Sequence, residues 1–136
     1  MEREKHRRFV AKRDIIGQPV FISDLEAEGR GMRLEELWSR AVLFHDIHEL
    51  ITTTEVVQPG AEVRDVSYVG FFEVLQGGSL RVGDVLRVNG RPIGQLAGFD
   101  LAHFPNHLNL VVRSERRLTG KDLGMTLEDE IRFTPE

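Results

Sequence analysis

Residues 80–90 read Leu-Arg-Val-Gly-Asp-Val-Leu-Arg-Val-Asn-Gly, and this stretch decides the fold. Its Gly-Asp pair is typical of a turn in which the aspartate accepts hydrogen bonds from turn amides. Val85–Val88 follows as a short strand. Asn89 and Gly90 tolerate the two positive φ values of a type I′ turn, so the chain is predicted to fold back as a hairpin. Ile93–Ala97 is the expected return strand.

Strand signals continue on both sides of this hairpin. The segment Val63–Leu75 is long and rich in aromatic residues, and Gly70 within it indicates a bulge. Leu108, Leu110 and Val112 alternate with their neighbours, which predicts a buried strand. The other predicted strands are Met125–Phe133 and, near the start of the chain, Arg8–Lys12 and Gln18–Ser23, which are expected to meet around Gly17.

One segment has helical rather than strand periodicity. Leu34, Leu37, Trp38 and Ala41 recur at helical spacing, which predicts a helix near residues 33–48. Strands joined by short turns favour a small closed barrel, because closure removes exposed strand edges. The predicted fold class is therefore mainly β (α+β): a small closed β-barrel of about seven strands with that one helix.

The composition is that of an ordinary globular chain, and it excludes several kinds of site and partner. The chain has 136 residues and a formal net charge of −4. This length predicts a single domain over residues 1–136, with a charged N-terminal segment at residues 1–13 that is expected to be partly mobile. The absence of cysteine excludes disulfides, thiolate metal sites and cysteine nucleophiles. The acidic balance argues against a nucleic-acid partner.

Hydropathy argues against a membrane partner. The longest uninterrupted apolar runs are four residues long, such as Ala41–Phe44, far short of a membrane span. The first ten residues are mostly charged and no apolar region follows them, which is unlike a secretory signal. A cytoplasmic location is therefore expected.

A first histidine cluster suggests a metal site. His45, His48 and Glu49 would share one face of a helix, because residues three and four apart are neighbours there. Two imidazoles and one carboxylate suit a divalent metal such as Zn²⁺, Fe²⁺ or Mn²⁺. On a strand the same spacing would place the two histidines on opposite faces, and the metal site would fail. No cofactor other than this divalent metal is predicted.

A second cluster suggests acid–base chemistry. His103 and His107 flank a proline-containing segment, and Asp100 precedes them. A loop that joins two strands is a common place for catalytic residues, and histidine transfers protons near neutral pH. These three residues are the candidate catalytic group. Three further residues are expected to contact a ligand: Asn106 in the same loop, Phe71 on the aromatic strand, and Arg113 at the start of a late basic run.

Several short segments of the C-terminal half resemble one known family. They are Phe72–Leu75, a short strand into a turn; Val82–Gly90, the Gly-Asp hairpin; Leu96–Gly98, a strand ending in glycine; Asn106–Leu110, a histidine before an alternating strand; and Gly124–Phe133, a closing strand. Over residues 68–133 this order is similar to the glucitol/sorbitol-specific IIA component of the bacterial phosphotransferase system. The resemblance implies a small β-barrel with a swapped hairpin.

The position of the family's phosphoryl-accepting histidine separates two alignments. In the first, that position falls on Val69–Phe72, which contains no histidine, so the barrel is shared and phosphotransfer is lost. In the second, His45–Leu50 matches the family's His-x-His-x-Glu-Leu, at the cost of an insertion before the hairpin. The first alignment is preferred, and a shared fold does not by itself carry function.

Three functions follow from these observations. The first is a small-molecule-binding or accessory protein built on the barrel. The second is a small enzyme of isomerase, lyase or cyclase type that uses one of the histidine clusters. The third is a phosphocarrier like the IIA component. The expected partner is a small-molecule ligand, and self-association as a homodimer is also expected because small barrels often pair.

Overall fold

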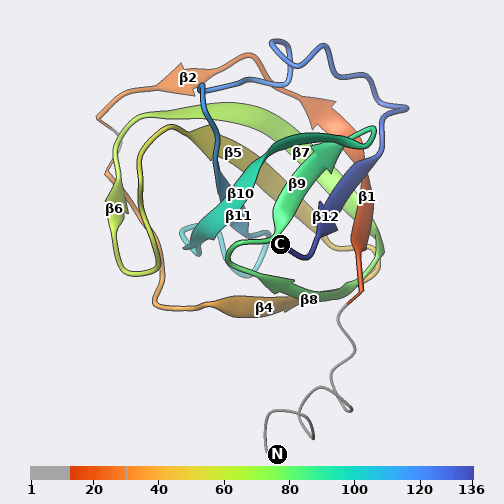
Figure 1. The fold of residues 1–136 in the computed structure, drawn as a ribbon, viewed down its shortest axis with the longest axis horizontal. Coiled ribbons are helices and arrows are strands. Elements are labelled where there is room, and N and C mark those ends of the chain that lie inside the picture. The colour runs from red at the N-terminus through yellow and green to blue at the C-terminus, as the bar shows by residue number, and fades with distance from the viewer. Residues whose placement is uncertain (1–12, 30) are drawn as a thin grey trace, which may run out of the picture.

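Seven strands pair edge to edge in a ring (Figure 1). The structure is a computed structural model that describes residues 13–29 and 31–136. Around the ring the order is β1 (Ile15–Ile22), β12 (Ile131–Thr134), β9 (Val85–Val88), β10 (Arg91–Asp100), β11 (Asn109–Arg113), β5 (Ile47–Thr53) and β7 (Val66–Gln76), and β7 pairs with β1 to complete it. Only the β5–β11 pair in the ring is parallel. The prediction of a mainly β fold is confirmed.

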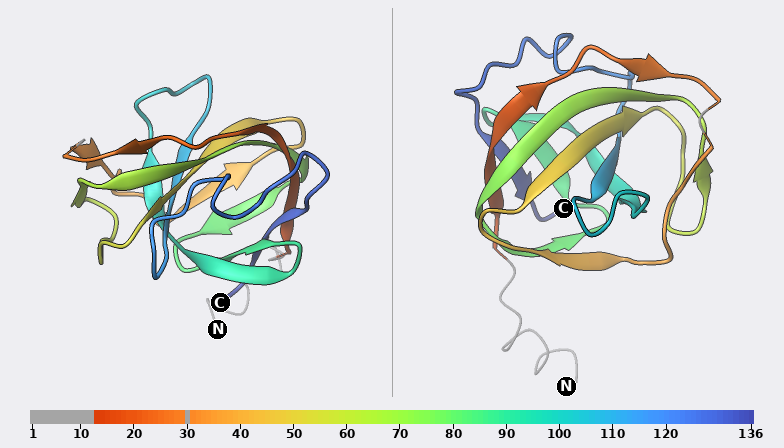
Figure 2. Two further views of the ribbon diagram at one scale, coloured as in Figure 1. Left: turned by 90° about the horizontal axis from the view of Figure 1, so that it is seen from above. Right: turned by 180° about the vertical axis from the view of Figure 1, so that it is seen from behind.

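Five short strands lie outside this ring. β2 (Glu26–Ala27) adds to the outer part of β7. β3 (Met32–Arg33) pairs with β6 (Glu62–Val63), and β4 (Ser39–Val42) pairs with β8 (Gly78–Arg81). The views in Figure 2 show β4 and β8 side by side at one end of the molecule, with the ring strands beyond them.

The predicted hairpin is confirmed. Asn89 and Gly90 both have positive φ, and Val88 pairs with Arg91 across the turn. Asp84 accepts a hydrogen bond from the backbone N–H of Arg81 at 2.9 Å, as the Gly-Asp turn requires. The return strand is longer than predicted, because β10 goes on past β9 and pairs with β11.

Two apolar clusters cover opposite faces of the ring strands. Leu50 belongs to the larger cluster, and the next residue of β5, Ile51, belongs to the smaller one. Successive side chains of a strand point to opposite faces, so β5 separates the two clusters. The larger cluster contains Phe72, Phe99 and Phe133, which are among the largest fully buried side chains. Of the ring strands, β5, β7, β10 and β11 contribute to both clusters and are therefore buried on both faces over part of their length.

The predicted helix near residues 33–48 is wrong. This segment contains β3, β4 and the start of β5, and no helix is present in the described part of the chain. Leu34 is fully buried, but Trp38 is 59% exposed, so the apolar residues do not share one buried face. The backbone N–H of Leu34 bonds Ala61, and β4 pairs residue by residue with β8. Pairing with distant segments outweighed the local helical spacing.

Two predictions concern the start of the chain. Gly17 was expected to join two strands, but it lies within β1 and pairs with both β12 and β7. A Cβ at this position would lie 2.4 Å from the Phe72 ring, so glycine permits the close approach of β7. The predicted strand Arg8–Lys12 and nearly all of the charged segment 1–13 lie outside the described residues.

Candidate functional site

Four neighbouring strands each place one residue in a row across the sheet, which we call the cross-strand row. Asp100 on β10 pairs with Asn109 on β11, Asn109 pairs with Glu49 on β5, and Glu49 pairs with Phe71 on β7. Paired residues of adjacent strands point to the same face. Since Leu50 lies in the larger cluster, Glu49 lies on the opposite face, together with Ile51.

The amide of Asn109 is the most buried polar group in this row. Asn109 is only 2% exposed, and its Nδ2 donates a hydrogen bond to Asp100 Oδ2 at 2.8 Å. On the side away from β10, Asn109 is the register partner of Glu49 on β5. Oδ1 is buried and has no hydrogen-bond partner among the residues that the structure describes.

His107 lies against the cross-strand row. Its Nε2 is 3.8 Å from Glu49 Oε1 and is buried without a hydrogen-bond partner within the described part of the chain. The edge of Phe71 meets the ring at 5.0 Å between centroids, and His103 stacks on it at 5.1 Å. Burial lowers the pKa of His107 and the nearby His103 ring lowers it further, while the Asn109 side chain, which can accept a hydrogen bond from the protonated ring, and the Asp100 carboxylate raise it less. The ring is therefore kept neutral near pH 7.

His48 lies on the other face of β5. It is 6% exposed, its Nδ1 accepts a hydrogen bond from the backbone N–H of Leu108 at 3.0 Å, and its Nε2 lies 3.3 Å from Asp46 Oδ2. Burial lowers the pKa of His48, against the raising effect of the Asp46 carboxylate. Nδ1 therefore holds the residue before β11 against β5, while Nε2 is engaged locally with Asp46.

The first predicted cluster is not assembled as one ligand set. His45 lies in the turn before β5, where its Nδ1 is 2.8 Å from Glu73 Oε2, while His48 and Glu49 are successive strand residues on opposite faces. The helix that would have brought the three residues together is not formed. Across residues 13–29 and 31–136, no group of three or more His, Asp or Glu side chains is arranged to hold a metal ion.

The second predicted cluster is assembled. Asp100 ends β10, His103 and His107 lie in the following loop, and Phe71 contacts His107 from β7. Asn106 is exposed in the same loop. Sequence reasoning missed Asn109. The available signal was a polar residue between two apolar positions of a strand predicted to be buried.

A separate groove of about 590 Å³ contains the last predicted ligand residue, Arg113. The groove lies between the first half of β10 and the segment that follows β11, and it shares no lining residue with the cross-strand row. Its polar lining includes Arg91, Arg113, Arg116, Gln95, Ser114 and Asp122, and its apolar lining includes Ile93, Leu118 and Leu123. A Cβ on Gly94 would lie 2.2 Å from the Arg113 carbonyl oxygen, so only glycine allows the two segments to approach this closely.

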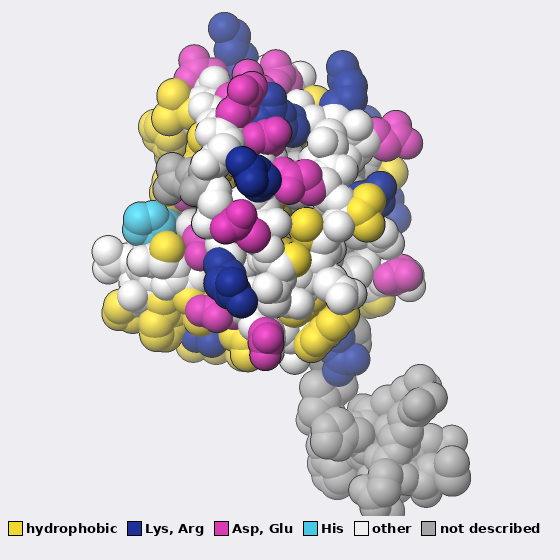
Figure 3. Space-filling model, turned by 90° about the vertical axis from the view of Figure 1, so that its left-hand side faces the viewer, with side chains coloured by type: hydrophobic (Ala, Val, Ile, Leu, Met, Phe, Trp, Pro, Cys, Tyr) yellow, Lys and Arg dark blue, Asp and Glu magenta, His cyan; other side chains and the backbone are white. Residues whose placement is uncertain are grey.

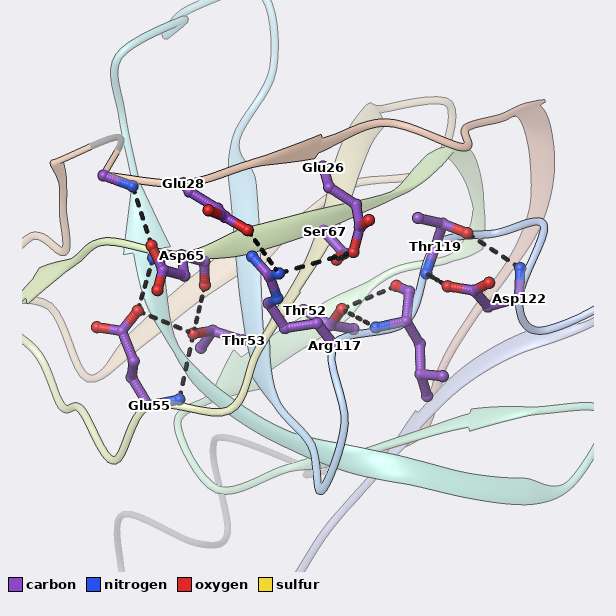
Figure 4. A network of polar contacts seen from close by, with 12 residues as sticks. Glu26, Glu28, Thr52, Thr53, Glu55, Asp65, Ser67, Arg117, Thr119 and Asp122 are labelled. Carbon is purple, nitrogen blue, oxygen red and sulfur yellow. Dashed lines mark hydrogen bonds and ion pairs between the residues drawn. The ribbon is translucent and has the colours of Figure 1, made fainter.

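Hydrogen bonds to β5 hold the far wall of this groove (Figure 4). Thr52 Oγ1 donates to the Leu118 carbonyl and accepts from the Leu118 N–H, both at 2.8 Å. Thr119 and Asp122 exchange two hydrogen bonds of 3.0 Å, and the one from the Thr119 N–H is the main reason that the pKa of Asp122 is lowered. These hydrogen bonds fix the position of the wall.

The arginines near the groove divide into two kinds. Arg117 forms ion pairs with Glu26 and Glu28 across the loop (Figure 4). Arg91, Arg113 and Arg116, which line the groove, form no ion pair and no side-chain hydrogen bond with the described residues. Three guanidinium groups that border one groove thus have no ion-pair partner in the described part of the chain.

The face of the molecule in Figure 3 carries charges of both signs rather than a cluster of arginines. Acidic and basic side chains are interspersed over that face, and hydrophobic side chains lie along its lower edge, at the level of β4 in Figure 1. The exposed apolar residues near β4 include Trp38, Leu43 and Phe44. In the part of the chain that the structure describes, no helix is long and apolar enough to cross a membrane.

Comparison with known proteins identifies a family without a described activity. A family model matches residues 9–134, and its description is "Family of unknown function (DUF6917)". The chain belongs to this family. The searches of curated proteins and of solved structures found no match. Membership in DUF6917 therefore assigns neither a ligand nor a reaction.

Proposed function

We propose that the protein binds a small anionic molecule in the groove lined by Arg91, Arg113 and Arg116. The observation that carries the proposal is that these three arginines border one cavity and form no ion pair with the described residues. A volume of about 590 Å³ falls within the range of small-molecule sites. The ring of seven strands would then be a small closed barrel that carries this site at its side.

The charges of the groove favour an anion. Three arginines face two acidic residues in the lining, Glu115 and Asp122. Asp122 already accepts the Thr119 N–H, and Arg116 also contributes to lowering its pKa. Arg91 and Arg113 are therefore the groups whose charge an anionic ligand would mainly neutralise. Guanidinium groups pair with carboxylates and phosphates in a planar, two-point geometry, which gives both affinity and specificity.

The apolar lining adds a second requirement. Ile93, Leu118 and Leu123 line the groove together with the arginines. A ligand with an apolar body and at least one carboxylate or phosphate would bury apolar surface and neutralise charge at the same time. We therefore expect organic acids and organic phosphates to bind more tightly than inorganic phosphate. The enzyme and phosphocarrier hypotheses stay predictions.

The test is a thermal-shift screen of organic carboxylates and phosphates, each beside its uncharged amide or alcohol analogue. A ligand at about 100 times its Kd stabilises the folded state by about 2.7 kcal/mol. For a domain of this size that energy raises Tm by about 10 °C. The affinity of the best compound is then measured by calorimetry for the wild type, for Arg113→Gln and for Arg64→Gln, which removes an exposed arginine outside the groove.

We expect binding to weaken at least about tenfold in Arg113→Gln, because a charge-assisted contact contributes about 1.5–3 kcal/mol. Arg64→Gln should bind as the wild type does. The proposal fails if charged and uncharged analogues shift Tm equally. It also fails if the two variants lose the same amount of affinity, since the effect would then reflect net charge alone.

A further inference from the structure

Two buried polar atoms of the cross-strand row lack a hydrogen-bond partner among the described residues: His107 Nε2 and Asn109 Oδ1. Buried polar atoms are nearly always paired, so each such atom calls for an explanation. Nε2 is 3.8 Å from Glu49 Oε1, and Oδ1 belongs to the register partner of Glu49, whose side chain is close enough to His107 to exchange a hydrogen bond with it.

The three groups have the chemistry of metal ligands. A carboxylate oxygen and an amide oxygen only accept hydrogen bonds, and a neutral imidazole presents one nitrogen as a lone-pair donor. The backbone holds all three, since Glu49 and Asn109 are register partners and His107 lies two residues before Asn109.

We propose that His107 Nε2, the Glu49 carboxylate and Asn109 Oδ1 bind one divalent cation of the first transition row, such as Zn²⁺. A mixed set of one imidazole and two oxygen ligands suits Zn²⁺, Mn²⁺ or Fe²⁺ and leaves coordination positions open for water or substrate. This set has only two His or acidic members and an amide as the third. It differs from the three-residue set predicted from the sequence and shares only Glu49 with it.

Neighbouring residues would orient these ligands. Asp100 accepts the hydrogen bond from Asn109 Nδ2 and so restricts the orientation of the amide. Phe71 meets the His107 ring edge-on and His103 stacks on its face, which together restrict the ring. Such outer contacts fix ligand orientation in metal sites, and their loss commonly weakens binding about 10–100-fold. Asp100 and His103 are therefore positioning residues in this proposal.

The experiment titrates chelator-treated, full-length protein with ZnCl₂ by calorimetry and follows the histidine rings by ¹H–¹⁵N NMR. We expect one Zn²⁺ per chain and a shift of the His107 ring nitrogen signals, with the His45 signals unchanged. His45 is the internal control, because its exposed pair with Glu73 is the natural place for adventitious Zn²⁺. A shift at His45 or His103 without one at His107 overturns the proposal.

Two variants make the assignment independent of folding. Glu49→Gln keeps the shape of the side chain and removes its charge, and we expect the Kd for Zn²⁺ to rise at least about tenfold. His45→Gln should bind Zn²⁺ as the wild type does, and both variants are checked for an unchanged far-UV spectrum. Equal affinity in Glu49→Gln and the wild type overturns the proposal. The proposal is also overturned if the wild type binds no Zn²⁺ and NMR shows a proton on His107 Nε2. An Nε2–H hydrogen bond to Asn109 Oδ1 would then account for both buried atoms.

The metal site and the groove are tested separately. Arg113→Gln should leave Zn²⁺ binding unchanged, because the groove shares no lining residue with the cross-strand row. Failure of the groove proposal therefore leaves the metal proposal standing, and the reverse also holds.

Discussion

A single substitution at Thr52 tests whether its hydroxyl holds the groove wall. Thr52 is fully buried, and its single hydroxyl makes two hydrogen bonds of 2.8 Å with the backbone of Leu118, one as donor and one as acceptor (Figure 4). The substitution Thr52→Val replaces this hydroxyl by a methyl group of similar size. It leaves the shape of β5 unchanged and deprives both Leu118 groups of their partner.

The expected loss follows from these two bonds. Each intramolecular hydrogen bond contributes about 1 kcal/mol net, and a buried group left without a partner costs about 1–3 kcal/mol. Thr52→Val should therefore lower the free energy of unfolding by about 2–4 kcal/mol. The matched control is Thr52→Ser, which keeps the hydroxyl and loses only the methyl group, at about 1 kcal/mol.

The assay is urea unfolding followed by tryptophan fluorescence and far-UV circular dichroism, with midpoints compared at an unchanged m value. At roughly 4 °C per kcal/mol, Thr52→Val should also melt several degrees below Thr52→Ser. Since Leu118 lines the groove, the valine variant should bind the best groove ligand more weakly than the serine variant. Equal stability of the two variants would refute the reasoning, because loss of the hydroxyl would then cost no more than loss of the methyl group.

Three further predictions concern the core, the ring and the histidines. Phe72→Ala should destabilise the protein by about 3–5 kcal/mol, because this ring is almost fully buried in the larger cluster. Chemical denaturation measures the loss of unfolding free energy. A loss under about 1 kcal/mol would contradict that packing. Gly70→Ala should disrupt the pairing of β1 with β7, because its Cβ would lie 2.0 Å from the Phe21 carbonyl oxygen at a φ of +144°. Amide hydrogen exchange should therefore accelerate in β1. Unchanged protection of the β1 amides would argue against this contact. The pKa values of His48 and His107 are lowered in the folded protein, so the unfolded chain binds protons at a higher pH than the folded chain does. The free energy of unfolding should therefore fall as the pH drops below about 6.5 and level off below the folded-state pKa values. Urea midpoints that do not change between pH 7.5 and 5 would exclude this linkage.

Local sequence signals predicted the parts of the fold that depend on a few adjacent residues. The Asn89-Gly90 turn and the Asp84 hydrogen bond form as predicted, because both depend on backbone conformations that those residue types favour wherever they occur. The bulge at Gly70 and the buried strand before Arg113 also follow from local composition. The helix near residues 33–48 failed because Leu34 and β4 found backbone partners far away in the chain.

The candidate sites show the same division. The sequence by itself placed His103 and His107 in one loop directly after Asp100, because the three are close neighbours along the chain and a proline lies between the two histidines. Only the tertiary structure decided that Glu49 joins them. The parallel pairing of β5 with β11 sets Glu49 beside Asn109, and no local pattern specifies which distant strand a given strand will pair with. The same pairing separates His48 from Glu49, since a strand sends adjacent side chains to opposite faces of the sheet.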